Sequence, residues 1–282
     1  GVNVSGRTAG DASESTVTGL ITVDFSDVEI DGFTLTNPGQ TNAVYVKPYS
    51  PSHSDITINH NIVDTVGGPA QTPNVHAILV YQGPDSVTIA HNRFNNIKSG
   101  AYSLSAIGVL DTASTDPSTD VVIDDNTFSD IASTTKGAYG VLINNAVGAS
   151  SAQITNNTFS GLNGGWTHAI GLEGPTSNAV VTGNIFSGLT AAGADKIAVF
   201  FEDNPNGGTV NVECNQFNGT AFYGVAVAAN DVTTWNYVAN ADNNWWGDAT
   251  GPNDPVSNPA GTGALVGPNV DYDPWLTTNV GC

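Results

Sequence analysis

Positively charged residues are scarce in this chain, and that scarcity narrows its range of partners. Lys and Arg together number 6 against 26 Asp and Glu, which gives a formal net charge of -20. A nucleic-acid-binding protein needs a basic face that follows the phosphates. An anionic membrane surface or a polyuronate chain would also be repelled by so acidic a protein. We therefore expect no nucleic-acid partner.

Sulfur-containing residues are nearly missing: there is no Met, and the two cysteines are Cys214 and Cys282. A single pair in an otherwise cysteine-free chain indicates either one disulfide or two free thiols. A disulfide would tie the last residue to the body of the protein and would imply an oxidising compartment.

Long apolar segments are missing as well. No run approaches the roughly 18 residues that span a bilayer, so no transmembrane segment is predicted. The chain opens on Gly1 without a signal peptide. We therefore expect a mature or excised piece whose targeting segment has been removed, from a secreted or cell-surface protein.

The abundant residues are Asn, Thr, Ser, Val and Gly, which suit strands and tight turns and recur here in a fixed order. The repeated phrase is apolar, any, apolar, polar, polar, Asn, any, large apolar, as in residues 87–94. Its Asn positions lie 27 to 34 residues apart, a period typical of a solenoid of strands. Those positions are Phe33 in the first copy, then Asn61, Asn92, Asn126, Asn157, Asn184, Asn215 and Asn244.

A second apolar strand follows in each unit, as in residues 77–80 and 169–172. Alternation predicts that its Ile and Val side chains point inward and its Ala and Gly positions outward. Coils then stack at about 4.8 Å and align equivalent residues in columns. We therefore predict an all-β fold, a single-stranded right-handed parallel β-helix of about eight coils over residues 1–247.

Residues 248–282 are rich in Pro, Gly and Asn and predict an irregular C-terminal arm of the same domain. We expect it to lie along the helix, with Trp275 and Leu276 anchored in a groove and Cys282 reaching Cys214. Its expected role is to cap the open end, because an exposed coil edge invites edge-to-edge aggregation.

Two columns of the repeat have a structural interpretation. Asn tolerates left-handed backbone at a tight corner, and stacked Asn side chains can bond one another along the axis. The last residue of each phrase is expected to form an internal stack of large apolar groups. These residues are Leu35, Val63, Phe94, Phe128, Phe159, Phe186, Phe217 and Trp246.

This repeat resembles the right-handed parallel β-helix repeat family, which contains pectate-lyase-like enzymes and many secreted surface proteins. The resemblance covers about residues 17–247. The tail, with Asn243-Asn244-Trp245-Trp246-Gly247 and Val270-Asp271-Tyr272-Asp273-Pro274-Trp275-Leu276, looks like the closing segment of bacterial and archaeal members. The resemblance implies the fold and leaves the function open, because the fold hosts lyases, hydrolases, epimerases, adhesins and inert stalks.

Glu173 and Glu202 are the strongest candidates for chemistry. They are two of only five glutamates and fall in one outward column on adjacent coils, with Gly171 leaving room beside them. Backbones about 5 Å apart suit the acid and nucleophile of a retaining glycoside hydrolase. A calcium site or two solvated surface acids are the alternatives. Residues expected to contact a substrate on the same apolar strip are Tyr45, Tyr81, Phe200, His168 and Asp203.

Candidate metal ligands occur in two other places. Asp116, Asp120 and Asp124 belong to the longest acidic turn and predict either a solvated loop or a calcium site. His60, His91 and Asp125 precede the Asn position in successive coils, where turn histidines are usually solvated and sometimes hold a metal.

Three functions remain open at this point. The first is a non-catalytic extracellular or cell-surface module for glycan binding, adhesion or structural display. The second is a carbohydrate-active enzyme, either a glycoside hydrolase that uses Glu173 and Glu202 or, less favoured, a calcium-dependent polysaccharide lyase. We assign no lyase active site to this chain, because no set of its residues matches such a site residue by residue. The third is a fibre or assembly subunit that associates with itself. No cofactor is predicted except a candidate calcium ion.

Overall fold

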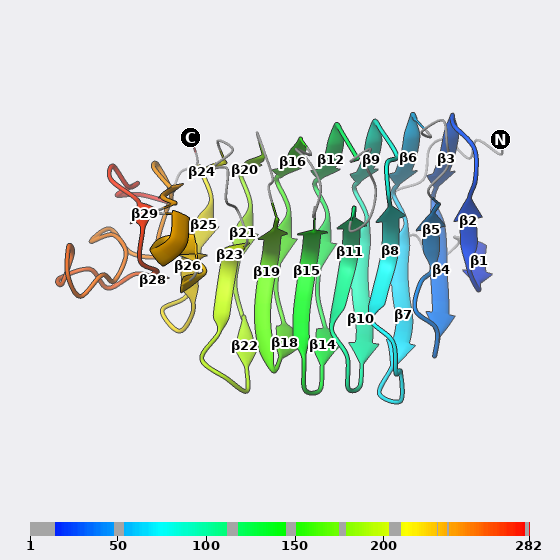
Figure 1. Ribbon diagram of the computed structural model, residues 1–282, viewed down its shortest axis with the longest axis horizontal. Helices are drawn as coiled ribbons and strands as arrows, with labels where there is room; N and C mark the ends of the chain where they lie inside the picture. The colour runs from blue at the N-terminus through cyan, green and yellow to red at the C-terminus, as the bar shows by residue number, and fades with distance from the viewer. Residues whose placement is uncertain are drawn as a thin grey trace.

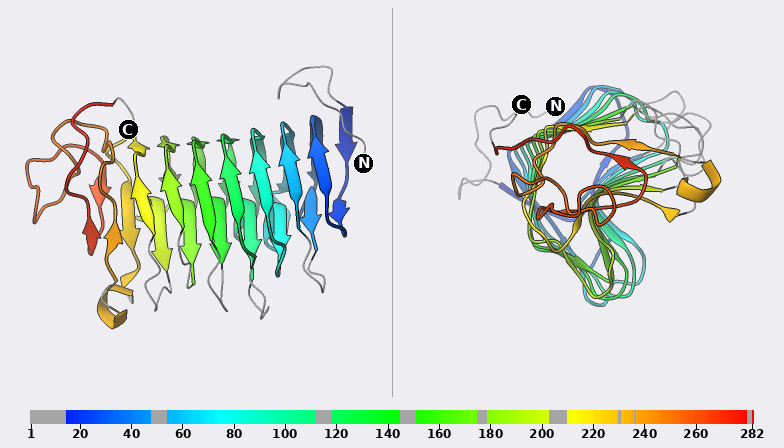
Figure 2. Two further views of the ribbon diagram at one scale, coloured as in Figure 1. Left: turned by 90° about the horizontal axis from the view of Figure 1, so that it is seen from above. Right: turned by 90° about the vertical axis from the view of Figure 1, so that its left-hand side faces the viewer.

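The computed structural model describes residues 15–47, 54–111, 118–144, 151–174, 179–202, 210–229, 231–235, 237–279 and 282. It shows a single-stranded parallel β-helix of about seven turns, which confirms the predicted fold. Figure 1 shows the turns stacked side by side, with β1 at one end and β29 toward the other. The view along the axis shows the strands arranged around one interior (Figure 2).

Three parallel sheets form the walls, and the strands of one sheet come from successive turns. Sheet A contains β1 (Ser15–Thr18), β4 (Phe33–Pro38), β7 (Ile62–Gly68), β10 (Arg93–Ser99), β13 (Thr127–Phe128), β14 (Ile131–Ser133), β17 (Thr158–Phe159), β18 (Leu162–Gly164), β21 (Ile185–Phe186), β22 (Thr190–Ala191) and β25 (Gln216–Phe217). Sheet B contains β2 (Ile21–Val23), β5 (Val44–Val46), β8 (Val75–Tyr81), β11 (Leu104–Leu110), β15 (Gly137–Asn144), β19 (Trp166–Glu173), β23 (Lys196–Glu202), β26 (Tyr223–Val227) and β28 (Leu265–Val266).

Sheet C contains β3 (Val28–Asp31), β6 (Ile56–Asn59), β9 (Val87–Ala90), β12 (Val121–Asp124), β16 (Ala152–Thr155), β20 (Val180–Thr182), β24 (Asn211–Glu213), β27 (Ala239–Asn240) and β29 (Val270–Asp271). One π-helical turn, η1 (Asp231–Trp235), follows sheet B near the C-terminal end. Among the described residues, no helix is long and apolar enough to cross a membrane.

The Ala and Gly column of sheet B points into the core, so the prediction that it faces outward is wrong. Ala106 and Ala169 are fully buried in the hydrophobic core. A Cβ atom added at Gly140 would lie 2.6 Å from the ring of Phe159, which places this column against the aromatic stack. The pairing of β11 with β15 passes from Ser105 directly to Ile107. Strict alternation therefore fails at this point of the strand. The strand bends, and the consecutive residues Ala106 and Ile107 both face inward.

The asparagine corner is a continuous ladder of hydrogen bonds. The backbone N–H of one coil donates to the Oδ1 atom of the Asn in the next coil at 2.8–3.0 Å, from Phe33 to Asn244. The side-chain amides also donate to the next Oδ1 at 3.0–3.1 Å. The predicted bonding along the axis is confirmed.

Left-handed backbone at this corner belongs to the residue before each Asn, and the expectation that the Asn itself adopts it is wrong. His60, Asp125 and Asn156, for example, have φ values of 51°, 48° and 57°. A left-handed residue turns the chain, and the Asn that follows keeps its side chain inside, where it replaces the missing backbone partners. Each Asn of the ladder is at most 2% exposed.

Large apolar side chains fill the interior beside the ladder, as predicted. The rings of Phe94, Phe128, Phe159, Phe186 and Phe217 stack with centroid separations of 4.5–5.4 Å. All five are fully buried. Because adjacent strands are about 4.8 Å apart, in-register aromatic residues must stack at this spacing.

The C-terminal arm lies across the end of the helix (Figure 2), where we expected it to lie alongside. It adds β28 to β26 and β29 to β27, so two of the sheets gain one more parallel strand. Tyr272 packs its ring edge-on against Trp246, the last member of the internal stack, with centroids 6.1 Å apart. Without the arm this apolar end would face water. The predicted Cys214–Cys282 disulfide is present and ties the arm down.

Candidate functional site

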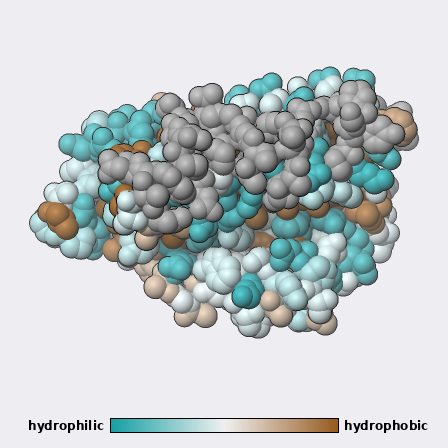
Figure 3. Space-filling model, viewed as in Figure 1, coloured by the Kyte–Doolittle hydropathy of each residue, from teal (hydrophilic) through white to brown (hydrophobic). Residues whose placement is uncertain are grey.

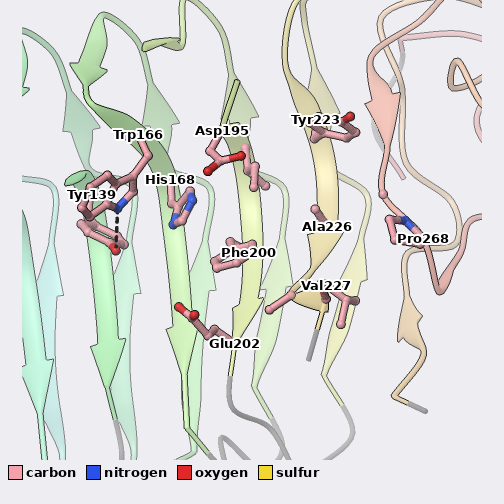
Figure 4. Close-up of a pocket in the computed structure, with 14 residues that line it drawn as sticks. Tyr139, Trp166, His168, Asp195, Phe200, Glu202, Tyr223, Ala226, Val227 and Pro268 are labelled. Carbon is pink, nitrogen blue, oxygen red and sulfur yellow. Dashed lines mark hydrogen bonds between the residues drawn. The ribbon is translucent and has the colours of Figure 1, made fainter. Parts of the chain in front are cut away.

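A groove of about 600 Å³ lies on the outer face of sheet B, over β15, β19, β23 and β26. Figure 3 views the molecule from the side of sheet B and shows apolar residues along the middle of this face, bordered by polar ones. The close-up in Figure 4 shows the side chains that project from these strands toward the groove. The described residues that line it include Tyr139, Trp166, His168, Asp195, Phe200, Glu202, Tyr223 and Pro268.

Hydrogen bonds fix one wall of the groove. The indole Nε1 of Trp166 donates to the Tyr139 hydroxyl at 3.2 Å, and that hydroxyl donates to the Oε1 atom of Glu173 at 3.1 Å. Asn144 donates from Nδ2 to the other carboxylate oxygen of Glu173 at 2.8 Å. The Trp166 ring is therefore held in position by residues from two neighbouring strands.

The space above Gly171 is occupied by Tyr139, so the expectation that this glycine leaves room beside the carboxylates is wrong. A Cβ atom added at Gly171 would lie 2.8 Å from the Tyr139 ring. Glycine lets the ring lie flat on the strand and reach Glu173. Burial, followed by the nearby Glu173 carboxylate, raises the pKa of the Tyr139 hydroxyl well above its usual range. The hydroxyl therefore stays protonated and can donate.

His168 forms the floor of the groove and is 5% exposed. Its ring centroid lies 4.2 Å from that of Phe200 and 5.3 Å from that of Tyr139, with Tyr139 edge-on. Burial lowers the pKa of His168 to about 3, so the ring is neutral at physiological pH. Its Nδ1 atom is buried and has no hydrogen-bond partner among the described residues. Such an atom is unusual in a folded protein and marks a position of interest.

Glu173 and Glu202 lie directly opposite each other on β19 and β23, in the register predicted for them. Adjacent strands are about 4.8 Å apart, so the two backbones are close. Their surroundings differ. Glu202 lines the groove beside Phe200, whereas Glu173 is not among its described lining residues and accepts hydrogen bonds from Tyr139 and Asn144.

The other residues predicted to contact a substrate divide into two sets. Phe200 and His168 line the groove. Tyr45 and Tyr81 lie near each other, with ring centroids 6.3 Å apart, but sheet B places Tyr45 four strands from β19, or about 19 Å. They do not join the groove. Asp203 lies outside the described residues.

Sequence reasoning missed Tyr139, Trp166, Asp195 and Tyr223. Tyr139 and Tyr223 belong to a third outward column of sheet B, on the N-terminal side of the strand bend. Regular alternation along each strand would place this column on the opposite face of sheet B from Gly171 and Phe200, because the positions are three residues apart. The available signal was Trp166, one of only five tryptophans, at the start of a repeat strand.

The candidate metal ligands are engaged in hydrogen bonds between coils. Asp124 accepts from the Thr155 hydroxyl and from Asn156, and Asp120 accepts from Ser151; Asp116 lies outside the described residues. Within the described ranges, no group of three His, Cys, Asp or Glu side chains is placed to hold a metal ion.

The histidines of the corner form a stacked pair. His60 and His91 have ring centroids 4.9 Å apart, and their Nδ1 atoms pair with Asp31 at 3.0 Å and Asp125 at 2.9 Å. Each ring is therefore oriented by a carboxylate from a neighbouring coil. Contacts within the protein therefore explain how the side chains of His60, His91 and Asp125 are placed in this column.

Comparison of the chain with protein-family models, with curated proteins and with solved structures finds no match. The fold is therefore assigned from strand topology, and the function has to be inferred from the groove.

Proposed function

We propose that this protein is an extracellular or cell-surface β-helix module that binds a glycan in the groove over β15, β19, β23 and β26. The observation that carries the proposal is the lining: four aromatic side chains, Tyr139, Trp166, Phe200 and Tyr223, share one open groove with the carboxyl groups of Asp195 and Glu202. We also propose kinship with the pectate-lyase-like β-helix proteins, on the strength of the repeat and the solenoid fold.

This lining suits a sugar chain. The apolar C–H face of a sugar packs on flat aromatic rings, and its hydroxyl groups need acceptors such as the Glu202 and Asp195 carboxylates. From β15 to β26 the groove crosses three strand spacings, about 14 Å, so it fits a short oligosaccharide lying along the helix axis. Pockets that combine aromatic walls with a few polar groups are the usual form of a ligand site.

Location outside the cell agrees with the covalent chemistry of the chain. The disulfide between Cys214 and Cys282 joins residues 68 positions apart and is compatible with an oxidising compartment. The acidity, with a net charge of -20, argues against a polyuronate, which would be repelled.

Titration calorimetry against a panel of neutral and acidic oligosaccharides tests the proposal. Trp166→Ala should weaken binding of any recognised glycan by about tenfold or more, since removing a large apolar side chain from a contact costs about 1.5–3 kcal/mol. Tyr81→Ala is the matched control, because this aromatic residue lies on the same sheet outside the groove.

Circular dichroism must show that both variants fold before their affinities are compared. Equal affinity of Trp166→Ala and Tyr81→Ala for a bound glycan would place the site elsewhere. Absence of binding to every glycan would reject the proposal.

A carbohydrate-active enzyme is the second candidate, favoured by the direct register of Glu173 and Glu202. Retaining glycoside hydrolases hold their two carboxyl groups about 5–5.5 Å apart. Mass spectrometry of the panel after incubation, with and without calcium, tests this candidate. Products that vanish in both Glu173→Gln and Glu202→Gln would establish a hydrolase, and calcium-dependent unsaturated products would indicate a lyase.

A further inference from the structure

We infer that the ligand of the groove carries a positively charged amino group, as in an oligosaccharide of glucosamine. This inference rests on the proposed glycan-binding function and specifies its substrate class. It follows from three independent features of the groove: the sign of its charges, the neutrality of its polar walls, and the orientation of its aromatic rings around the carboxylates.

The charges that line the groove are all negative. Among its described lining residues, Asp195 and Glu202 carry carboxylates, and no Lys or Arg contributes to the lining. Two lysines lie close to lining residues without being among the described lining residues themselves. Lys136 is exposed, and Lys196 begins β23 without lining the groove. A concave site with low-dielectric walls and one sign of charge concentrates ligands of the opposite sign.

Two of the polar lining residues, Tyr139 and His168, add no positive charge to the groove. The Tyr139 hydroxyl stays protonated and His168 stays neutral, because burial disfavours their charged forms. In His168 the Nδ1 atom is buried, so the ring bounds the floor of the groove without adding a charge.

Aromatic rings beside carboxylates are the general means of recognising organic cations, since the ring face attracts positive charge. Figure 4 shows Phe200 between His168 and Glu202, with the rings of Tyr139 and Trp166 along one side. The protein itself supplies an example of this attraction: the Nζ atom of Lys136 lies 5.8 Å from the centre of the Trp166 ring. A protonated amino sugar would satisfy both the rings and the carboxylates.

The test compares three matched tetrasaccharides by titration calorimetry, namely β-1,4-linked glucosamine, N-acetylglucosamine and glucose. The titrations are run at about pH 5.5 and moderate salt, where the amino group of the sugar is protonated. We expect the glucosamine tetramer to bind at least about tenfold more tightly than either neutral tetramer. That ratio corresponds to one charged contact of about 1.4 kcal/mol.

Two variants locate the effect. Glu202→Gln should reduce the affinity for the glucosamine tetramer by about tenfold more than it reduces the affinity for either neutral tetramer; Asp195→Asn should act in the same direction. Glu29→Gln removes an exposed carboxylate from sheet C and is the matched control for net charge. It should leave all three affinities within about twofold.

The outcomes separate the two proposals. Equal affinity for all three tetramers would overturn the amino-sugar inference while the glycan-binding function stands. Failure of every tetramer to bind, while another glycan of the panel binds, would overturn the amino-sugar inference alone, and failure of every glycan of the panel would overturn both. A tetralysine peptide that binds as tightly as the glucosamine tetramer, or an equal loss in Glu29→Gln, would show plain charge attraction and also overturn the inference.

Discussion

The asparagine corner and the outer face of sheet B are built from the same coils, yet they differ in how strictly they repeat. At the corner, seven successive coils place an Asn whose Oδ1 atom accepts the backbone N–H of the preceding coil, from Asn61 to Asn244. Along the outward column of sheet B, the paired residues change from Leu79 to Gly108 to Phe200. Where every coil carries the same residue, that residue serves to hold the coils together. Where the residue changes from coil to coil, stacking does not require a particular side chain, and the position can serve a ligand.

The largest expected loss of stability comes from a substitution in the internal stack of aromatic rings, which lies beside the asparagine corner. Phe159 is fully buried between Phe128 and Phe186. Phe159→Ala should lower the free energy of unfolding by about 4 kcal/mol, because it leaves a cavity. Urea denaturation measures this change. A loss below about 1 kcal/mol would mean that the neighbouring rings collapse into the space.

Breaking the ladder itself should cost slightly less. Asn157→Ala removes the acceptor for the Asn126 backbone N–H and side-chain amide, and a donor to the Ile123 carbonyl. Leaving these buried groups unpaired should cost about 3 kcal/mol in urea denaturation. Asn218→Ala, at an exposed Asn of the same chain, is the control and should change stability by less than about 0.5 kcal/mol. Equal effects of the two substitutions would contradict the structural role of the ladder.

Acidification should affect the outer face of sheet B through its buried histidines. Burial lowers the pKa of His76 to about 4 and that of His168 to about 3. The unfolded chain therefore takes up protons below about pH 6.5 while the folded protein does not, so stability present above that pH is lost as the pH falls. Each histidine should remove about 2 kcal/mol between about pH 7.5 and 5.

Urea denaturation at those two pH values checks this prediction. Carboxylates also titrate below neutrality, so the informative quantity is the difference between the wild type and His76→Gln. The variant should lose about 2 kcal/mol less than the wild type on acidification. An identical loss in both proteins would show that His76 is protonated as readily in the folded state as in the unfolded state.

The smallest expected effect on stability is at the wall of the groove. Tyr139→Phe keeps the ring over Gly171 and removes the hydroxyl that links Trp166 to Glu173. The free energy of unfolding should fall by about 1 kcal/mol in urea denaturation. Affinity for the bound glycan should fall by a few-fold, because Trp166 loses its orienting bond. A change in stability as large as that of Asn157→Ala would indicate that the two regions are equally structural.

Much of the fold could be predicted because the repeat has a single physical solution. An apolar phrase with a period near 30 cannot bury its strands unless the coils stack, and the stack then aligns Asn with Asn and Phe with Phe. Cys214 and Cys282 are the only two cysteines of the chain, so the sequence left one disulfide or two free thiols, and the structure shows the disulfide. The register of Glu173 with Glu202 was predicted by the same reasoning, and pairing of β19 with β23 confirms it.

The groove could be predicted only in part. Phe200, His168 and Glu202 lie on strands that the repeat identifies, so the sequence marked them. Tyr139 and Tyr223 depend on the bend in sheet B, where an inward Ala or Gly interrupts the alternation. Pro268 comes from an arm whose position at the end of the helix depends on contacts such as Tyr272 with Trp246.

The sequence by itself therefore determined the solenoid and its internal columns, because each follows from one coil repeated next to itself. Only the tertiary structure decided that Tyr139 covers Gly171, that Glu173 is bound by Tyr139 and Asn144 while Glu202 faces the groove, and that His168 is buried and neutral. These features depend on which side chain leans over which neighbour on an outer face, and no repeat constrains that choice.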